Sequence, residues 1–307
     1  MPIIEVAIVS RDDQLYEGFP DVTATPGGRL VCVCRESDAH RPVAISNLVW
    51  RTSDDSGRTW GPRRLLAEAE CRGDRLFAWN CPRIVCLQDG RLIYICDGYE
   101  LPPDRDQGFR DSRIYFWVST DDGQTFEGPQ CQAGPIGVVP DKILVTRQGT
   151  WMFSTTYRPA SGKMEGQYLW RSTDEGKTWT DHQVHFKYGK VHTDLITLKD
   201  GRILMTYAAR MGELEGKVYH GIEAVISRDH GRTWDWDKRF ILFRWAMHQT
   251  MHSPCSLELA DGRILTLFLY HYGAQWGKAG AGGSARTLGI TSAVIWSPGA
   301  VIPAQTN

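Results

Sequence analysis

The chain has 307 residues, of which 35 are basic and 36 are acidic, so its formal net charge is −1. A nucleic-acid-binding surface normally shows a basic excess, so DNA or RNA binding is not expected. Hydrophobic residues make up 42% of the chain, and no run approaches the ~18 apolar residues of a membrane span. The start, MPIIEVAIVSRDD, turns acidic too early for a signal peptide, so we expect a cytoplasmic protein.

Five short turns that contain glycine recur along the chain. Each has a strand-like run on both sides, as in DLITLKDGRILMTY, and therefore predicts a β-hairpin. The turns are GGR at 27–29, DGR at 89–91, QGT at 148–150, DGR at 200–202 and DGR at 261–263.

An eight-residue motif, S-x-D-x-G-x-T-aromatic, recurs between these turns. Its copies begin at residues 53, 119, 172 and 227, and lie 66, 53 and 55 residues apart. A period of that size is typical of an array of supersecondary units. In the last copy, SRDHGRTW, we expect Asp229 and Ser227 to bind turn amides, Gly231 to take a positive φ, and Trp234 to fill space between sheets. The motif is therefore predicted to be structural.

The order of elements within one repeat predicts the fold. Each repeat reads strand, glycine turn, strand, variable loop, strand, the Ser/Asp motif and a fourth strand, which is typical of a β-propeller blade. We predict a single all-β propeller domain over residues 1–307. Five four-stranded antiparallel blades begin near residues 20, 80, 139, 191 and 252, and the N-terminal strand IIEVAIVS closes the last blade.

The eight cysteines are expected to be reduced. Cys32, Cys34, Cys86 and Cys96 lie in alternating apolar segments, where a thiol behaves as a small buried hydrophobic group. The chain has no CxxC pair, and no other spacing indicates a metal ligand set. We therefore expect neither a metal nor a cofactor.

Four copies of the Ser/Asp motif at blade spacing resemble the Asp-box, or BNR, repeats of the sialidase (neuraminidase) superfamily. The resemblance covers nearly the whole chain and gives six blades as the alternative count. It implies a glycoside hydrolase with a carbohydrate substrate. It also implies that the functional face carries the residues just before each first strand and just after each second strand.

The family's chemistry assigns roles to residues on that face. Sialidases use a tyrosine nucleophile supported by a glutamate, an aspartate as acid/base, and three arginines that clamp the substrate carboxylate. The resemblance implies Asp38 as acid/base with Glu36 as second choice, Tyr270 or Tyr272 as nucleophile and Glu213 as its base; His40 is a further catalytic candidate if the chemistry uses histidine. The implied substrate-binding residues are Arg35, Arg83, Asp97, Tyr157, Arg158, His192, Asp194, Arg210, His252 and His271.

One departure from the family pattern bears on the substrate. Sialidases begin the first blade with F-R-I-P, whereas this chain has EGFP, which places Gly18 at the arginine. A carboxylate clamp depends on guanidinium placement, so the sequence argues against sialic acid. Another terminal sugar is expected, with acidic and deoxy sugars both open.

Two alternatives to a sialidase-like hydrolase remain at this stage. A polysaccharide lyase or glycosidase would use histidine and tyrosine for proton transfer, with His40, His192 or His252 as candidates. A non-catalytic propeller would bind a glycan or a protein without turnover. Individually, loop Arg, Asp and Glu residues are commonly solvated surface residues, and His192 and His252 also fit as fillers of inner strands. The sequence does not indicate the oligomeric state.

Overall fold

The computed structural model describes residues 8–10, 12–39, 42, 44–101, 110–157, 166–182, 190–214, 217–245, 252–259, 261–272 and 288–298. Within these ranges the strands form five antiparallel sheets, which we name A to E in chain order. The helical content described is one 3-10 turn, η2 (Trp236–Lys238). The all-β prediction is therefore confirmed. Among the described residues, no helix is long and apolar enough to cross a membrane.

The chain divides into two compact units. The first comprises Met1–Val145, Thr150–Met164 and Tyr168–His182, and the second comprises Thr146–Gly149, Glu165–Gln167 and Gln183–Asn307. Sheets A, B and most of C belong to the first unit, and sheets D and E belong to the second. The prediction of one closed propeller domain stays a prediction.

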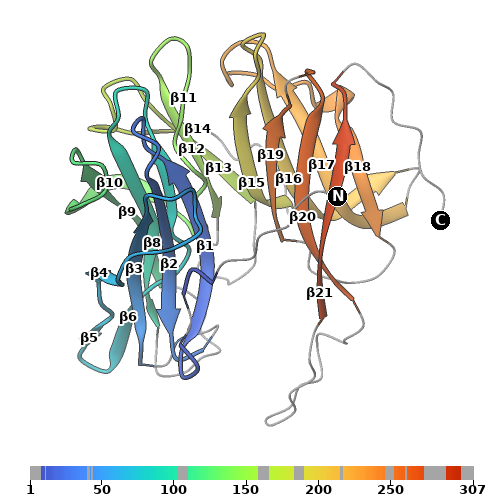
Figure 1. Cartoon of the computed structure of the whole chain (residues 1–307). Helices are drawn as coiled ribbons and strands as arrows, with labels where there is room; N and C mark the ends of the chain where they lie inside the picture. The colour runs from blue at the N-terminus through green and yellow to red at the C-terminus, as the bar shows by residue number, and fades with distance from the viewer. Residues whose placement is uncertain are drawn as a thin grey trace. The chain divides into compact units, whose positions relative to one another are not determined.

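The first unit contains sheet B, which has more described strands than any of the other four sheets (Figure 1). Sheet A has the order β1 (Tyr16–Ala24), β2 (Leu30–Ser37), β3 (Ser46–Ser53) and β4 (Arg64–Ala67). Sheet B has the order β10 (Glu127–Ile136), β9 (Arg110–Ser119), β8 (Leu92–Leu101), β6 (Arg75–Trp79) and β5 (Glu70–Arg72), and β7 (Arg83–Cys86) also pairs with β8. Sheet C has the order β11 (Leu144–Val145), β12 (Trp151–Tyr157), β13 (Gly166–Ser172) and β14 (Thr180–His182).

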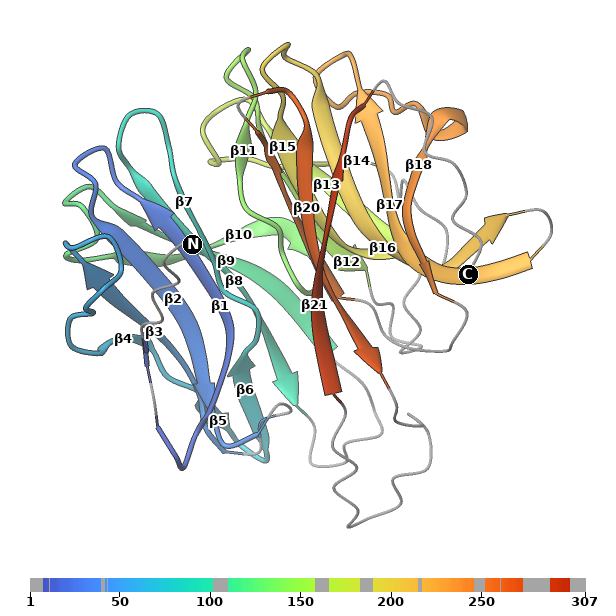
Figure 2. The same ribbon diagram turned by 45° about the vertical axis from the view of Figure 1, so that its right-hand side comes forward.

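Sheet B departs from the four-strand plan. Strand β8 pairs with β7 along its first half and with β6 along its second half. The hairpin of β5 and β6 is therefore an addition that the repeat pattern did not predict. Strands β1 and β7, the first strands of sheets A and B, lie side by side (Figure 2).

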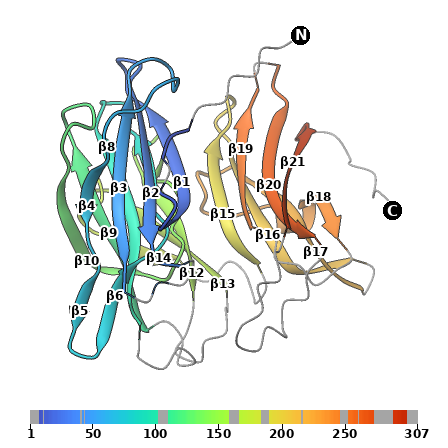
Figure 3. The same ribbon diagram turned by 60° about the horizontal axis from the view of Figure 1, so that its bottom comes forward.

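The second unit holds two neighbouring sheets. Sheet D has the order β15 (Lys190–Thr197), β16 (Ile203–Leu214), β17 (Lys217–Ser227) and β18 (Phe240–Trp245). Sheet E has the order β19 (His252–Glu258), β20 (Ile264–Tyr272) and β21 (Leu288–Trp296). Strands β15 and β19 lie side by side (Figure 3). Of the predicted closing strand IIEVAIVS, residues 3–7 lie outside the described residues, and residues 8–10 form no strand.

The five glycine turns form as predicted. The glycines have φ angles between 80° and 90°, the left-handed region that favours glycine, and they are Gly28, Gly90, Gly149, Gly201 and Gly262. In each turn the glycine amide donates to the carbonyl three residues earlier, at 2.8–3.1 Å.

The Ser/Asp motifs, which we call boxes 1 to 4, share one set of hydrogen bonds. In box 3, Asp174 accepts from the amide of Thr178 at 2.9 Å and from its hydroxyl at 2.6 Å. The Ser172 hydroxyl donates to Asp174 at 2.7 Å and accepts from the amide of Gly176 at 2.7 Å. The same bonds recur in boxes 1, 2 and 4 at 2.6–3.0 Å. The structural role predicted for the motif is confirmed.

Aromatic residues of the boxes fill the space between sheets of the first unit. In box 2, Phe126 meets the ring of Trp50 from sheet A with centroids 5.3 Å apart. In box 3, Trp179 stacks on Phe116 of sheet B at 5.6 Å and meets Phe153 of its own sheet at 4.8 Å. These contacts bury apolar surface between sheets A and B and between sheets B and C.

All eight cysteines carry free thiols. Burial raises the pKa of Cys32 to about 11 and that of Cys34 to about 12. Thiols with such high pKa values contain little thiolate near neutral pH and are poor nucleophiles. Cys32 and Cys96 are buried, as the alternating pattern predicted, whereas Cys34 and Cys86 are partly buried.

Candidate functional site

The end of sheets A and B away from the glycine turns brings three polar residues together. In sheet A, Arg35 near the end of β2 pairs with Gly18 of β1. Its guanidinium donates to the side-chain oxygen of Asn80 at 3.2 Å. The side-chain amide of Asn80 in turn donates to Asp97 of β8 at 2.8 Å. The chain Arg35–Asn80–Asp97 therefore links a cation to an anion through an amide whose dipole is oriented for both bonds.

Asp97 ties several segments together from a fully buried position. Besides Asn80, its carboxylate accepts the backbone amide of Cys81 at 3.0 Å and that of Val139, which precedes sheet C. Burial raises the pKa of Asp97 above its ordinary value, although these donors act in the opposite direction. Since a buried charge needs such partners, this carboxylate organises the end of sheet B.

Aromatic rings cover Arg35, which is fully buried. Its guanidinium lies 4.7 Å from the ring centroid of Phe19 and 5.8 Å from that of Tyr16. A Cβ atom on Gly18 would collide with the Tyr16 ring. Cross-strand partners project on the same face of a sheet, so Arg35 lies beside the place that a side chain at position 18 would take. The glycine thus makes room for a tyrosine and an arginine from neighbouring positions.

Glu36 and Asp38 are in contrasting environments. Glu36 is 2% exposed, and both of its carboxylate oxygens accept from Nε of Arg63, at 2.7 and 3.0 Å. Asp38 follows β2 in an exposed loop, where its carboxylate accepts the amide of Ala44 at 2.8 Å. Of the two acids, Asp38 is the one that a substrate can reach.

Three sheets have a strained residue in or shortly before their first strand. Phe19, Val139 and His192 have φ angles of 56°, 54° and 54°, a region that is costly for side chains of these types, above all for a β-branched one. Each lies two positions before an aspartate. Strain of this kind collects at functional sites and is maintained by surrounding contacts.

Two of the aspartates after these strained residues bind neighbouring strands. Asp21 accepts the amide of Ile84 in β7 at 2.9 Å and pairs with Lys142 at 2.8 Å. Asp194 is 8% exposed and accepts the amide of Ser256 in β19 at 2.6 Å. The strained turn therefore aims a carboxylate sideways at the next first strand.

The remaining predicted site residues are placed to different degrees. Arg83 is partly buried, and its guanidinium donates to the carbonyl of Pro82 at 3.4 Å. For seven further candidates, the structure describes the backbone, which lies in a strand, but not the side chain. They are Tyr157, Arg210, Glu213, His252, Tyr270, His271 and Tyr272. His40 and Arg158 lie outside the described residues altogether. A site that combines candidate residues of both units stays a prediction.

Sequence analysis missed a buried polar cluster in sheet D. Glu223 is fully buried and accepts the hydroxyls of Tyr207 and Tyr219, and Arg239 lies 3.6 Å from its carboxylate. Burial and the Glu223 charge raise the pKa of both tyrosines. The signal was a single acid in the apolar strand GIEAVIS, since a buried charge requires partners.

No metal site is evident in the parts of the chain described above. No group of three or more His, Cys, Asp or Glu side chains in these ranges has the arrangement needed to hold a metal ion. The chemistry available near the end of β2 is that of an exposed carboxylate, Asp38, and a buried and hydrogen-bonded arginine, Arg35.

Several solved structures share the fold. A protein of unknown function from Dyadobacter fermentans DSM 18053 has a TM-score of 0.61 and 20% identity, over 87% of this chain and 78% of that chain. A Trypanosoma rangeli sialidase gives 0.59 and 12%, over 83% of this chain and 44% of that one, so the match spans less than half of the sialidase. A Penicillium chrysogenum α-L-arabinanase complexed with arabinobiose gives 0.57 and 13%, over 92% and 77%. No curated protein matches the sequence.

These similarities support the resemblance inferred from the boxes. At 12–20% identity they show a shared fold. The sequence also matches the family described as BNR repeat-like domain over residues 99–268, which is more than half of the chain. The four boxes, the glycine turns and this match lead to one conclusion: the chain belongs to the BNR repeat-like domain family and is sialidase-like in fold.

Proposed function

We propose that the protein is a glycoside hydrolase that acts on a terminal sugar at the end of sheets A and B. The observation that carries the proposal is the buried chain Arg35–Asn80–Asp97 together with an exposed acid, Asp38, three residues after Arg35 in the sequence. Similarity to a sialidase and to an arabinanase supports hydrolysis of a glycosidic bond. It does not favour the lyase or the purely binding alternative.

Asp38 is the proposed general acid/base. Glycosidases need one carboxyl group to protonate the leaving oxygen and a second group on the other side of the sugar. Asp38 is exposed in its loop, whereas Glu36 is buried against Arg63. Arg35 is too buried to touch a sugar directly, so its proposed part is to hold Asn80 and to supply positive charge beneath the site.

We take the second group from the sialidase resemblance. Tyr270 or Tyr272 is proposed as the nucleophile and Glu213 as its base, with His252, His192 and Arg210 as sugar-binding residues. Gly18 in place of the family's arginine supports a substrate other than sialic acid.

The test is turnover by an Asp38→Asn variant. We would assay aryl glycosides of neutral, uronic, deoxy and sialic acid sugars, and expect the wild type to release the aryl group from at least one. Loss of general acid/base catalysis lowers kcat by about 10²- to 10⁴-fold, and we expect Tm to be nearly unchanged because Asp38 is exposed. Asp89→Asn, in an exposed turn, is the control. Absence of any turnover by wild type contradicts the hydrolase, and unchanged turnover with a lower Tm makes Asp38 structural.

A further inference from the structure

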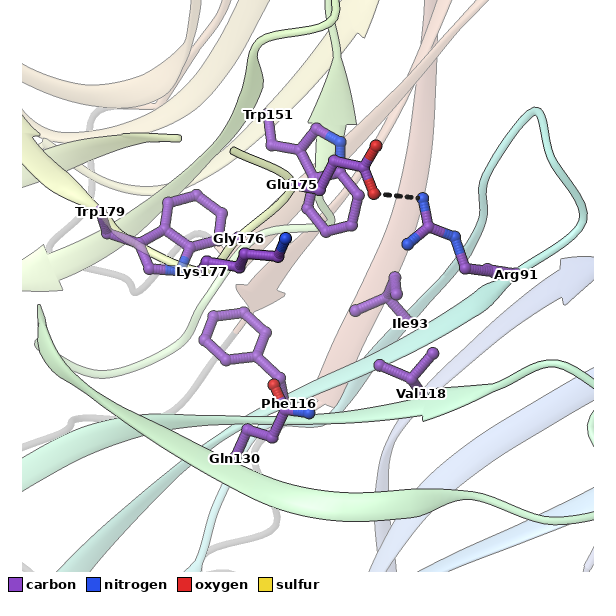
Figure 4. A pocket seen from close by; sticks show the side chains of 10 residues that line it. All are labelled: Arg91, Ile93, Phe116, Val118, Gln130, Trp151, Glu175, Gly176, Lys177 and Trp179. Carbon is purple, nitrogen blue, oxygen red and sulfur yellow. Dashed lines mark hydrogen bonds and ion pairs between the residues drawn. The ribbon is translucent and has the colours of Figure 1, made fainter. Parts of the chain in front are cut away.

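A cavity of about 190 Å³ lies between sheets B and C, at the box end of the first unit (Figure 4). Phe116 of β9 and Trp151 and Trp179 of sheet C form its apolar walls. Gln130, Lys177 and the ion pair of Arg91 with Glu175 supply its polar groups. Arg91 ends the turn that leads into β8, whereas Asp97 lies in the second half of that strand, so the cavity is separate from the candidate active site.

The interface between sheets A and B shows how such a cavity is normally filled. Trp50 and Phe116 are equivalent, since each lies three residues before the serine of a box. The indole N–H of Trp50 donates to the carbonyl of Gly123 in box 2 at 3.0 Å. Phe116 is smaller and has no N–H, so it cannot make the corresponding bond to Gly176 in box 3. The space beside Gly176 is left open.

A second replacement opens the mouth of the cavity. Arg64 pairs with Trp50 in sheet A, as Gln130 pairs with Phe116 in sheet B. Arg64 reaches the carbonyl of Gln124 in box 2 at 2.7 Å and lies over the Trp50 ring. Gln130 is shorter and uncharged. The residue that seals the gap between sheets A and B is therefore missing between sheets B and C.

Gly176 of box 3, at the opposite wall of the cavity, packs on residues of its own sheet rather than on sheet B. A Cβ on Gly176 would lie 3.3 Å from Trp151 and 3.3 Å from Trp179, both in its own sheet. A Cβ on the equivalent Gly123 would lie 2.8 Å from Val31 of the neighbouring sheet. Box 2 is thus pressed against sheet A, whereas two tryptophans support box 3 from behind.

The chemistry of the lining indicates its ligand. Phe116, Trp151 and Trp179 are 6–9% exposed, so each offers a narrow apolar edge that the C–H groups of a sugar ring can contact. The volume is below the ~300–1,000 Å³ of pockets for drug-sized ligands. One sugar ring, with hydroxyls that both donate and accept, fits this size and polarity.

Charge narrows the choice of sugar. Arg91 is neutralised by Asp89 at 2.6 Å and by Glu175 at 3.0 Å. In the described structure no ion pair involves Lys177, so its exposed ammonium is available for a ligand carboxylate. We propose that this cavity is a second, non-catalytic carbohydrate site that takes one ring of an acidic glycan, as in a hexuronate.

The test measures binding of methyl β-glucuronide and methyl β-glucoside. Titration is followed by tryptophan fluorescence and by NMR of the labelled protein, in which Phe116, Gly176 and Lys177 signals report on the cavity. We expect weak, saturable binding of both sugars, with the glucuronide tighter by roughly 2- to 5-fold, the size of one exposed ion pair. If neither sugar shifts these signals, the proposal fails.

Variants assign binding to this cavity. Phe116→Trp with Gln130→Arg reproduces the filled interface of sheets A and B, and binding should be lost. Gln130→Arg alone should weaken binding if the double variant fails to fold. Lys177→Gln should abolish the preference for the glucuronide and retain glucoside binding. Arg58→Gln, the equivalent change in box 1, is the control and should leave both affinities unchanged.

The outcome is independent of the proposed catalytic site. Asp38→Asn should leave the cavity's affinity unchanged, whatever its effect on turnover. If Asp38→Asn removes the NMR shifts, or if a folded double variant binds like wild type, the sugars bind elsewhere and the second site is rejected.

Discussion

The two ends of sheet B follow different rules. At the box end, the same turn and the same four hydrogen bonds recur from sheet to sheet, with Asp, Ser, Gly and Thr at fixed positions. At the other end, the sheets carry different polar residues, such as Arg35 in sheet A and Asp97 in sheet B. Repetition at one end preserves a structure that every sheet needs, and variation at the other end allows chemistry that only one place needs.

Substitutions in the second half of β8 and in the turn that precedes it should separate these two roles most strongly. Asp97→Ala removes a fully buried carboxylate and leaves the donors of Asn80, Cys81 and Val139 without an acceptor. We expect the free energy of unfolding to fall by about 3–5 kcal/mol, as when one partner of a buried ionic network is removed. Urea denaturation measures it.

The matched control lies at the box end of the same strand. Asp89 is half exposed and pairs with Arg91 in the glycine turn. Asp89→Ala should cost about 1 kcal/mol or less, because exposed ion pairs contribute little. Equal losses for the two variants would mean that Asp97 does not organise its end of the sheet.

The next largest effect compares two glycines with the same backbone conformation. Gly123 in box 2 has φ 75° and Gly149 in a hairpin turn has φ 80°. Gly149→Ala should cost about 1–2 kcal/mol for the left-handed backbone alone, since no atom lies within 4 Å of the added Cβ. Gly123→Ala adds a clash with Val31 at 2.8 Å and with Leu92 at 3.1 Å, and overpacking costs about 1–3 kcal/mol more. Thermal and urea unfolding of both variants check this order.

The same comparison explains what the sequence could predict. Box 3 is built from groups two to four residues apart, such as Ser172 and Asp174, so its motif specifies its geometry locally. Arg35 and Asn80 are 45 residues apart, and their contact depends on how sheet A packs on sheet B. The sequence identifies Arg35 and Asp38 as polar residues of the same region. Only the packing of the sheets shows that Arg35 is buried and that Asp38 is exposed.

The strained residues in or before the first strands are not indicated by the sequence. Valine is β-branched and rarely takes a positive φ, and although histidine takes it more often than most residues, no motif marks His192 for it. The β5–β6 hairpin was not predicted for another reason. It is an insertion into one repeat, whereas the prediction of four strands per sheet took all repeats to be alike. Repeat logic predicts shared features and misses those of a single sheet.

Lowering the pH from about 4 towards 2 should reduce the stability that the Ser/Asp boxes contribute to the fold. Hydrogen bonds from the hydroxyl and amide of Thr178 lower the pKa of Asp174 to about 2, and Thr59 does the same for Asp55. A lowered folded-state pKa means that the stabilisation is fully present above the unfolded value near 4 and is lost as pH falls towards 2. We expect the urea midpoint to fall across this window.

Asp174→Asn tests the cause of that pH dependence. The amide cannot titrate, so the variant should be less stable at pH 7 and should lose less stability between pH 4 and pH 2 than wild type. A variant curve parallel to that of wild type would show that the pH dependence arises elsewhere.

The smallest expected effect concerns the ion pair that spans sheets B and C. Arg91 and Glu175 lie 3.0 Å apart, and the Glu175 side chain is 61% exposed. Glu175→Gln keeps the backbone, which has φ 58°, and removes only the charge. We expect a loss of about 0.2–1 kcal/mol, smaller still in 1 M salt because exposed charges are screened. A larger loss that persists in salt would mean that this pair, rather than the stacking of Trp179 on Phe116, holds box 3 against sheet B. The cavity between them would then depend on charge more than on aromatic packing.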